Sequence, residues 1–171
     1  MKSAALGFAL ALVASGAALA QAPAGPPRPP GPPARGPSAA VAVELAQDAI
    51  AACAANGYKV TAVVLNSAGM QRVQISSDGA PDMTGPVGLR KAFTVITFGQ
   101  PSGAVGDKAK TDAALADRLK SDPKLIGWAG GEPLTAGGQV IGALGVSGAP
   151  GGDKDDACAN AAIAKVGGRL S

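Results

Sequence analysis

The sequence contains no histidine and few aromatic residues, with one Trp, one Tyr and three Phe in 171 residues. Without histidine, this chain alone cannot form a Ser-His-Asp triad, a Cys-His dyad, or a zinc or haem site with imidazole ligands. Its two cysteines form no Cys-x-x-Cys motif, which argues against a redox site of that kind. The length fits one ordinary domain together with a segment of low complexity.

Positive charge is scarce in the body of the chain, although the formal net charge is +3. Three of the 15 basic residues, Lys2, Arg28 and Arg35, precede residue 38, and the other 12 are matched by 12 acidic residues. Nucleic-acid binding depends on clustered Lys and Arg that neutralise phosphates. A neutral body therefore predicts no nucleic-acid partner.

Residues 1–20 have the features of a secretory signal peptide. Lys2 precedes an apolar stretch over 4–13, and the small residues Ala18-Leu19-Ala20 provide a cleavage site before Gln21. The stretch is too short and too rich in Ala and Gly for a retained membrane anchor. We therefore expect an exported protein, periplasmic or secreted, with no stable membrane span after cleavage.

Residues 21–37 form a Pro-rich linker, with eight Pro between Pro23 and Pro37. Such a segment cannot bury a core and favours polyproline II, which predicts a spacer ahead of a domain over 38–171. The alternative is a polyproline ligand for an aromatic-lined groove.

Export also affects the interpretation of Cys53 and Cys158, because an oxidising compartment allows a structural disulfide. Each cysteine lies in an Ala-rich helical pattern, one near each end of the domain. A bridge would clamp the first helix to the last. Two buried thiols that act as small apolar residues are the alternative.

The body alternates helical and strand-like patterns. Helices are expected from Ser38, a potential N-cap, to Ala55, and over 87–98, about 107–119, and 153–166. Strands are expected over 58–65 and 70–75, joined as a hairpin, and over 139–146, with the short apolar pieces LIGWA and PLTA before the last. This order predicts an α+β fold in which helices flank an antiparallel sheet of about five strands.

Three glycine-marked segments are candidate binding loops: SDGAP at 77–81, AGGEPL at 129–134 and GALGVSGAPGG at 142–152. Glycine allows main-chain N–H groups to approach an anionic group such as a carboxylate. The candidate ligand-binding residues are Asp78, Gly79, Arg90, Lys91, Gly130, Gly131, Glu132, Gly145 and Ser147. No catalytic residue is assigned, because nothing in the sequence shows that the titratable groups converge.

Five segments together resemble the GlcG/HbpS-like family of haem-binding or haem-degrading proteins. They are VTAVVLNSAGM at 60–70, SDGAPDM at 77–83, LRKAFTVITFGQPS at 89–102, GWAGGEPLTAGGQVIGALGVSG at 127–148, and DDACANAAI at 155–163. The resemblance implies a profilin-like fold, homo-oligomers, and haem or tetrapyrrole binding in some members. It also implies Thr94, in the KAFT segment, as a contact to the haem iron.

The chain departs from the family pattern at two positions, where Asn66 and Ser76 stand in place of a common Asp and Arg. This loses a charge pair or a clamp for an acidic ligand.

Without histidine, the other potential iron ligands include Met70, Met83, Tyr58 and Lys91, whereas Arg90 and Lys91 could pair with propionates. The sequence thus predicts a small-molecule ligand, with haem as the first candidate. The alternatives are an organic-acid-binding or purely structural oligomeric module, or a weak enzyme acting on a small carboxylate metabolite.

Overall fold

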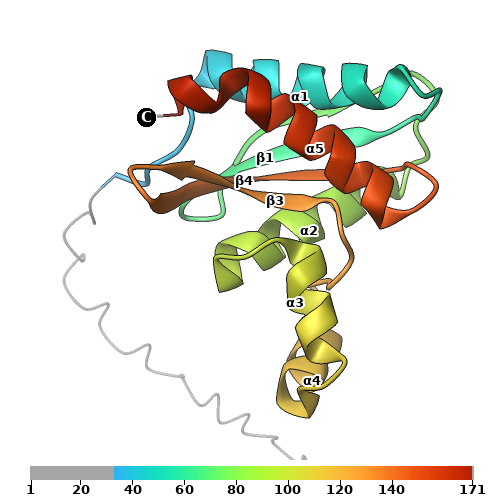
Figure 1. Ribbon diagram of the computed structural model, residues 1–171, viewed down its shortest axis with the longest axis vertical. Coiled ribbons are helices and arrows are strands. Elements are labelled where there is room, and N and C mark those ends of the chain that lie inside the picture. Colours follow the sequence, from blue (N-terminus) through green and yellow to red (C-terminus); the bar gives the residue numbers. More distant parts are fainter. Residues whose placement is uncertain (1–32, 171) are drawn as a thin grey trace, which may run out of the picture. The chain divides into compact units, whose positions relative to one another are not determined.

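The computed structural model describes residues 33–170; the expected signal peptide and most of the Pro-rich linker lie outside this range. The helices are α1 (Ala39–Ala54), α2 (Thr84–Phe98), α3 (Ser102–Ala109), α4 (Ala113–Ser121) and α5 (Gly152–Val166), followed by a short 3-10 turn, Gly167–Arg169. The strands are β1 (Thr61–Asn66), β2 (Gln71–Ser76), β3 (Gly131–Ala136) and β4 (Gln139–Ser147) (Figure 1). None of the helices in this range has the length and apolar character needed to span a bilayer.

The strands form one antiparallel sheet in the order β2-β1-β4-β3. The hairpin of β1 and β2 and the strand over 139–146 are as expected from the sequence, and the PLTA piece lies in β3. The α+β prediction is confirmed, with four strands in the described residues where about five were expected. The central strands β1 and β4 are almost wholly buried, which matches their continuous apolar sequence.

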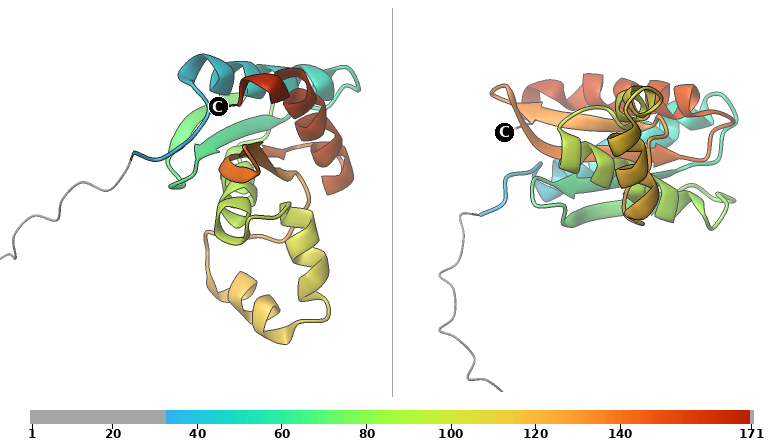
Figure 2. Two further views of the ribbon diagram at one scale, coloured as in Figure 1. Left: turned by 60° about the vertical axis from the view of Figure 1, so that its left-hand side comes forward. Right: turned by 90° about the horizontal axis from the view of Figure 1, so that it is seen from below.

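Helices cover both faces of the sheet (Figures 1 and 2). Helices α1 and α5 lie side by side on one face, and α2 lies on the other with α3 and α4 beyond it. Ser38 caps α1 as expected, with its side chain accepting a hydrogen bond from Val41 N–H. The apolar positions of α1 at spacing four, from Val41 to Cys53, are buried against the sheet and α5.

Cys53 of α1 and Cys158 of α5 form a disulfide in the structure, with Cα atoms 5.4 Å apart. The bridge joins the first helix of the domain to the last, across 105 residues of chain. The structure therefore contains the disulfide between the two helices and not two separate buried thiols.

The predicted helix over 107–119 is wrong in its extent. The structure has two shorter helices, α3 and α4, because Asp112 interrupts the pattern and caps α4 by accepting a hydrogen bond from Leu115 N–H at 3.0 Å. Helix α4 has no buried residue. Helix α2 also begins earlier than expected, at Thr84, with Pro86 accommodated in its first turn.

The end of the Pro-rich segment contacts the domain. The carbonyl oxygen of Arg35 accepts a hydrogen bond from Ser67 N–H at 2.8 Å, and Gly36 packs against Asn66. These residues are attached to the β1–β2 turn, so the segment that can act as a spacer ends before Arg35.

Candidate functional site

A pocket of about 330 Å³ opens between the start of α2, the loop after β4 and the start of α5. Two of its lining side chains, Met83 and Trp128, are large, apolar and exposed, at 66% and 61%. Four others, Thr84, Lys91, Ser147 and Asp155, are polar and buried. The pocket thus has a polar base and an apolar rim.

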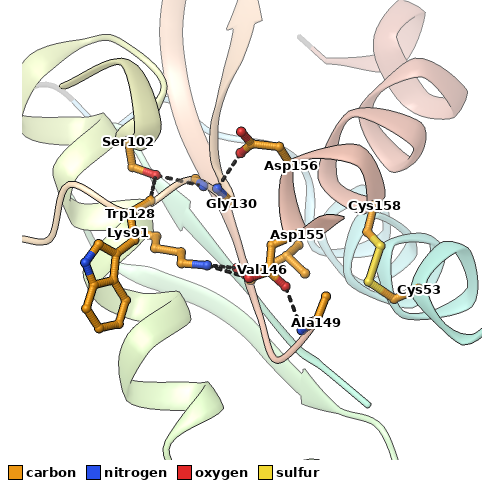
Figure 3. Close-up of polar contacts among 11 residues, drawn as sticks. Cys53, Lys91, Ser102, Trp128, Gly130, Val146, Ala149, Asp155, Asp156 and Cys158 are labelled. Atoms are coloured by element: carbon orange, nitrogen blue, oxygen red, sulfur yellow. Dashed lines mark hydrogen bonds and ion pairs between the residues drawn. A yellow bond between two sulfur atoms is a disulfide. The ribbon is translucent and has the colours of Figure 1, made fainter. Parts of the chain in front are cut away.

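A buried ion pair forms the base. The Lys91 ammonium donates hydrogen bonds to Asp155 Oδ2 at 2.7 Å and to the carbonyl oxygen of Val146 at 2.9 Å (Figure 3). Asp155 Oδ1 accepts a hydrogen bond from Ala149 N–H at 3.0 Å. Burial raises the pKa of the Asp155 carboxyl, although the hydrogen bond from Lys91 opposes that change. The pair joins α2, β4 and α5, and Asp155 compensates the charge of Lys91.

The lack of a side chain at Gly130 leaves space for this ion pair. The residue has φ of +116°, and a Cβ atom there would lie 2.6 Å from Lys91 Nζ and 2.7 Å from the Asp155 Cβ atom. Both the backbone conformation and the space therefore require glycine. Gly130 N–H also donates a hydrogen bond to Asp156 on α5 (Figure 3). The AGGEPL segment thus contacts the ion pair through Gly130, which does not itself line the pocket.

Trp128 has a fixed main chain and an exposed side chain. The buried Ser102 hydroxyl donates a hydrogen bond to the Trp128 carbonyl oxygen at 2.6 Å and accepts one from Gly131 N–H at 2.9 Å (Figure 3). Gly127 packs so closely against Gly106 of α3 that a Cβ at Gly106 would lie 1.8 Å from the Gly127 carbonyl oxygen. The indole is therefore held at the rim of the pocket from a rigid support.

Sequence reasoning did not select Ser102, Trp128 or Asp155 as site residues, and it named Met83 only as one of several potential iron ligands. The single Trp, set between glycine-rich segments, was a usable signal, because an isolated large aromatic side chain in such a segment has little local core to pack into. Asp155 could not be separated from Asp153 and Asp156 by sequence, because all three lie in the first turns of one helix.

The structure brings together four of the selected residues: Lys91 and Ser147 line the pocket, and Gly130 and Gly131 lie directly behind Lys91. Gly145 is buried under α2, where a Cβ would lie 2.0 Å from the Gly88 carbonyl oxygen. Its role is close packing of a helix on the sheet. The SDGAP loop is different, because Asp78 and Gly79 are exposed and do not line this pocket.

Thr94 and Arg90 are directed toward the segment before β3. Thr94 is fully buried, and its hydroxyl lies 3.0 Å from the carbonyl oxygens of Arg90 and Ile126 and accepts a hydrogen bond from Ile126 N–H at 2.9 Å. Arg90 donates to the Leu125 carbonyl oxygen at 2.7 Å. Thr94 is thus a structural link between α2 and this segment, and the arrangement does not favour the expected iron contact.

Glu132 lies on β3, facing α5. Burial, with repulsion from the neighbouring Asp156 as the second cause, raises the pKa of Glu132 to about 7. The described residues contain no group of three or more His, Cys, Asp or Glu side chains placed to hold a metal ion. Glu132 on β3 and Asp156 on α5 form a carboxyl pair next to the pocket residue Asp155.

The two departures from the family pattern have structural roles. Asn66 Oδ1 accepts hydrogen bonds from Ala68 N–H at 3.0 Å and Met70 N–H at 2.9 Å, which holds the β1–β2 turn. The Ser76 hydroxyl bonds to Thr61 Oγ1 at 2.8 Å, and Thr61 Oγ1 bonds in turn to Thr84 at the pocket at 2.7 Å.

The described residues thus form a small α+β domain with helices on both faces of an antiparallel sheet and a pocket beside a buried ion pair. The chain is a member of the HbpS-like family, since the profile described as "Haem degrading protein HbpS-like" matches residues 38–164. No protein of curated function shows significant sequence similarity to it.

Solved structures agree with this membership. The crystal structure of HbpS is 32% identical, with a TM-score of 0.70, and the match covers 75% of this chain and 89% of that one. A double mutant of HbpS from Streptomyces reticuli is 30% identical, with a TM-score of 0.72 and coverage of 86% and 98%. The structure of a PduOC–haem complex shares the fold at 23% identity, with a TM-score of 0.69 and coverage of 74% and 92%.

Proposed function

We propose that this domain binds haem or a related tetrapyrrole at the pocket between α2 and α5, without strong catalytic activity of its own. The observation that carries the proposal is the pair of exposed apolar side chains, Met83 and Trp128, at the rim of that pocket. Membership of a family described as haem-degrading supports the choice of ligand.

The residues present fit such a group in two respects. An indole face offers a platform for a flat aromatic ring, and a Met thioether is an established type of iron ligand. Met83 and Trp128 would hold the macrocycle, and bound haem would supply iron and its redox chemistry. Because the pocket is shallow beside a porphyrin, the ring would lie at its mouth, with modest affinity.

The same structure does not favour an organic-acid ligand at this pocket. The Lys91 ammonium is 2.7 Å from Asp155 and already compensated, so it offers no net positive charge to a small carboxylate.

A hemin titration of the mature protein tests the proposal. We expect a shift of the Soret band that saturates at a defined ratio of hemin to protein. Met83→Ala should weaken binding several-fold and alter the band, because it removes the exposed thioether at the pocket.

Met70→Ala is the matched control. Met70 is equally exposed, at 65%, but lies at the β1–β2 turn, whereas the pocket lies at the opposite end of β1. Equal loss of binding in both variants would indicate non-specific adsorption of hemin. A wild-type titration that does not saturate would favour the organic-acid or structural alternative.

Export and homo-oligomerisation are part of the proposal. The disulfide between Cys53 and Cys158 supports an oxidising compartment. Mass measurement of the protein recovered outside the cytoplasm should give a chain that starts at Gln21, and light scattering coupled to gel filtration should give a mass above that of one chain. A full-length chain retained inside the cell, or a monomer at all concentrations, would contradict these two points.

A further inference from the structure

A second hollow, of about 400 Å³, lies between α3 and α4 and shares Trp128 with the first pocket. Its apolar lining comes from small and aliphatic residues, among them Leu119 and Ile126, and its charged lining comes from Lys110 and Lys120. Trp128 thus lines both the first pocket, whose buried Lys91 is neutralised, and a hollow with two lysines.

None of the described residues that line the first pocket offers an uncompensated positive charge. Of the described residues that line it, Lys91 alone carries positive charge, and Asp155 compensates that charge. The Arg90 guanidinium is also unavailable, because it is turned toward the Leu125 carbonyl oxygen. Carboxylates on a ligand that lies against Trp128 would therefore need cations from elsewhere.

Lys110 and Lys120 are available to such carboxylates. Lys110 pairs with Asp107 at 2.6 Å, but both side chains are about three-quarters exposed, and surface pairs of this kind are weak and easily exchanged. Within residues 33–170, Lys120 takes part in none of the ion pairs. The close contact of Gly106 with Gly127 fixes α3 relative to the Trp128 segment, and Lys110 and Trp128 line the same hollow.

We infer that Lys110 and Lys120 bind the carboxylate side chains of the tetrapyrrole whose ring lies against Trp128, and so select acidic tetrapyrroles over their esters. The inference rests on the proposed function and assigns a specificity role to a hollow outside the first pocket. It requires no iron, because the selection acts on the edge of the ring.

The test compares protoporphyrin IX, which carries two carboxylates, with its dimethyl ester. Trp128 is the single tryptophan of the chain, so quenching of intrinsic tryptophan fluorescence reports a ring bound beside it. At low ionic strength, in one buffer with a fixed amount of non-ionic detergent, we expect the diacid to bind about tenfold more tightly than the ester.

The double variant Lys110→Ala/Lys120→Ala should lower the affinity for the diacid to that for the ester, and leave the affinity for the ester unchanged. The matched control is Arg72→Ala/Lys165→Ala, which removes the same charge from β2 and the C-terminal part of α5. This control should retain the preference for the diacid.

The outcomes separate the two proposals. Equal binding of diacid and ester by the wild type, or equal behaviour of the two double variants, would overturn the role of the lysines while tetrapyrrole binding stands. The absence of saturable quenching by either compound would overturn tetrapyrrole binding at Trp128 itself.

Discussion

The two faces of the sheet are built on different principles. Under α1 and α5 lies a large apolar cluster that includes Leu45, Val64 and Leu144, closed by the disulfide. Under α2 the buried apolar cluster is small, and buried polar side chains such as Lys91 and Thr94 take over much of the packing. Apolar burial and the clamp therefore stabilise one face, whereas specific polar contacts shape the pocket on the other.

Removal of the disulfide should have the largest effect on stability. The bridge closes a loop of about 100 residues, and replacing both Cys53 and Cys158 by Ala should lower the free energy of unfolding by about 4 kcal/mol. Urea unfolding of the oxidised protein and the double variant measures the difference.

Reduction of the wild type with dithiothreitol is the control, and should move its urea midpoint close to that of the double variant. An intact mass under non-reducing conditions that shows two free thiols would contradict the clamp directly. Hemin binding below the unfolding transition should change little, because the bridge lies on the face away from α2.

Breaking the ion pair should be the next largest effect. Lys91→Met leaves the Asp155 carboxylate buried without its partner, which should cost about 3 kcal/mol or more. The double variant Lys91→Met/Asp155→Leu removes both charges and should recover much of the loss. Urea unfolding measures both, and a single variant as stable as the wild type would show that the pair does not organise the pocket face.

The apolar face could be predicted from the sequence far better than the polar one. The spacing of Val41, Leu45, Ala49 and Cys53 identified the buried side of α1, because burial of a helix face leaves a periodic trace in sequence. The pairing of Lys91 with Asp155 leaves no such trace, since 64 residues separate them and only the fold brings them together.

Thr94 shows the same limit at one residue. Its place in a family-like segment predicts contact with iron, which stays a prediction; the structure adds that its hydroxyl joins α2 to Ile126. An i to i−4 hydrogen bond within a helix is local and can be anticipated, but a contact with a segment 32 residues away depends on the tertiary structure.

Substitution of Thr94 tests this structural role. Thr94→Val leaves the Ile126 N–H buried without an acceptor and should lower the free energy of unfolding by about 2 kcal/mol. Thr94→Ser keeps the hydroxyl and should cost less. The hemin spectrum should be unchanged in both variants. A Soret band altered in Thr94→Val alone would indicate that Thr94 contacts the haem iron.

The smallest expected effect concerns Glu132, which lies on β3 and faces α5. Its pKa of about 7 exceeds the usual value for a glutamic acid, so the folded protein binds this proton more tightly than the unfolded chain does. The resulting stabilisation is complete below the unfolded pKa of about 4.3 and is lost as the pH rises to about 7. Glu132→Gln should reduce the change of the free energy of unfolding with pH. It should also stabilise the protein at pH about 8 by about 1 kcal/mol, after allowance for solvent screening.

Glu44→Gln, at an exposed carboxylate paired with Arg169, is the control and should keep the slope of the free energy of unfolding against pH. Urea unfolding at about pH 5 and pH 8 measures the pH dependence of all three proteins, and equal slopes would contradict a raised pKa of Glu132 in the folded state.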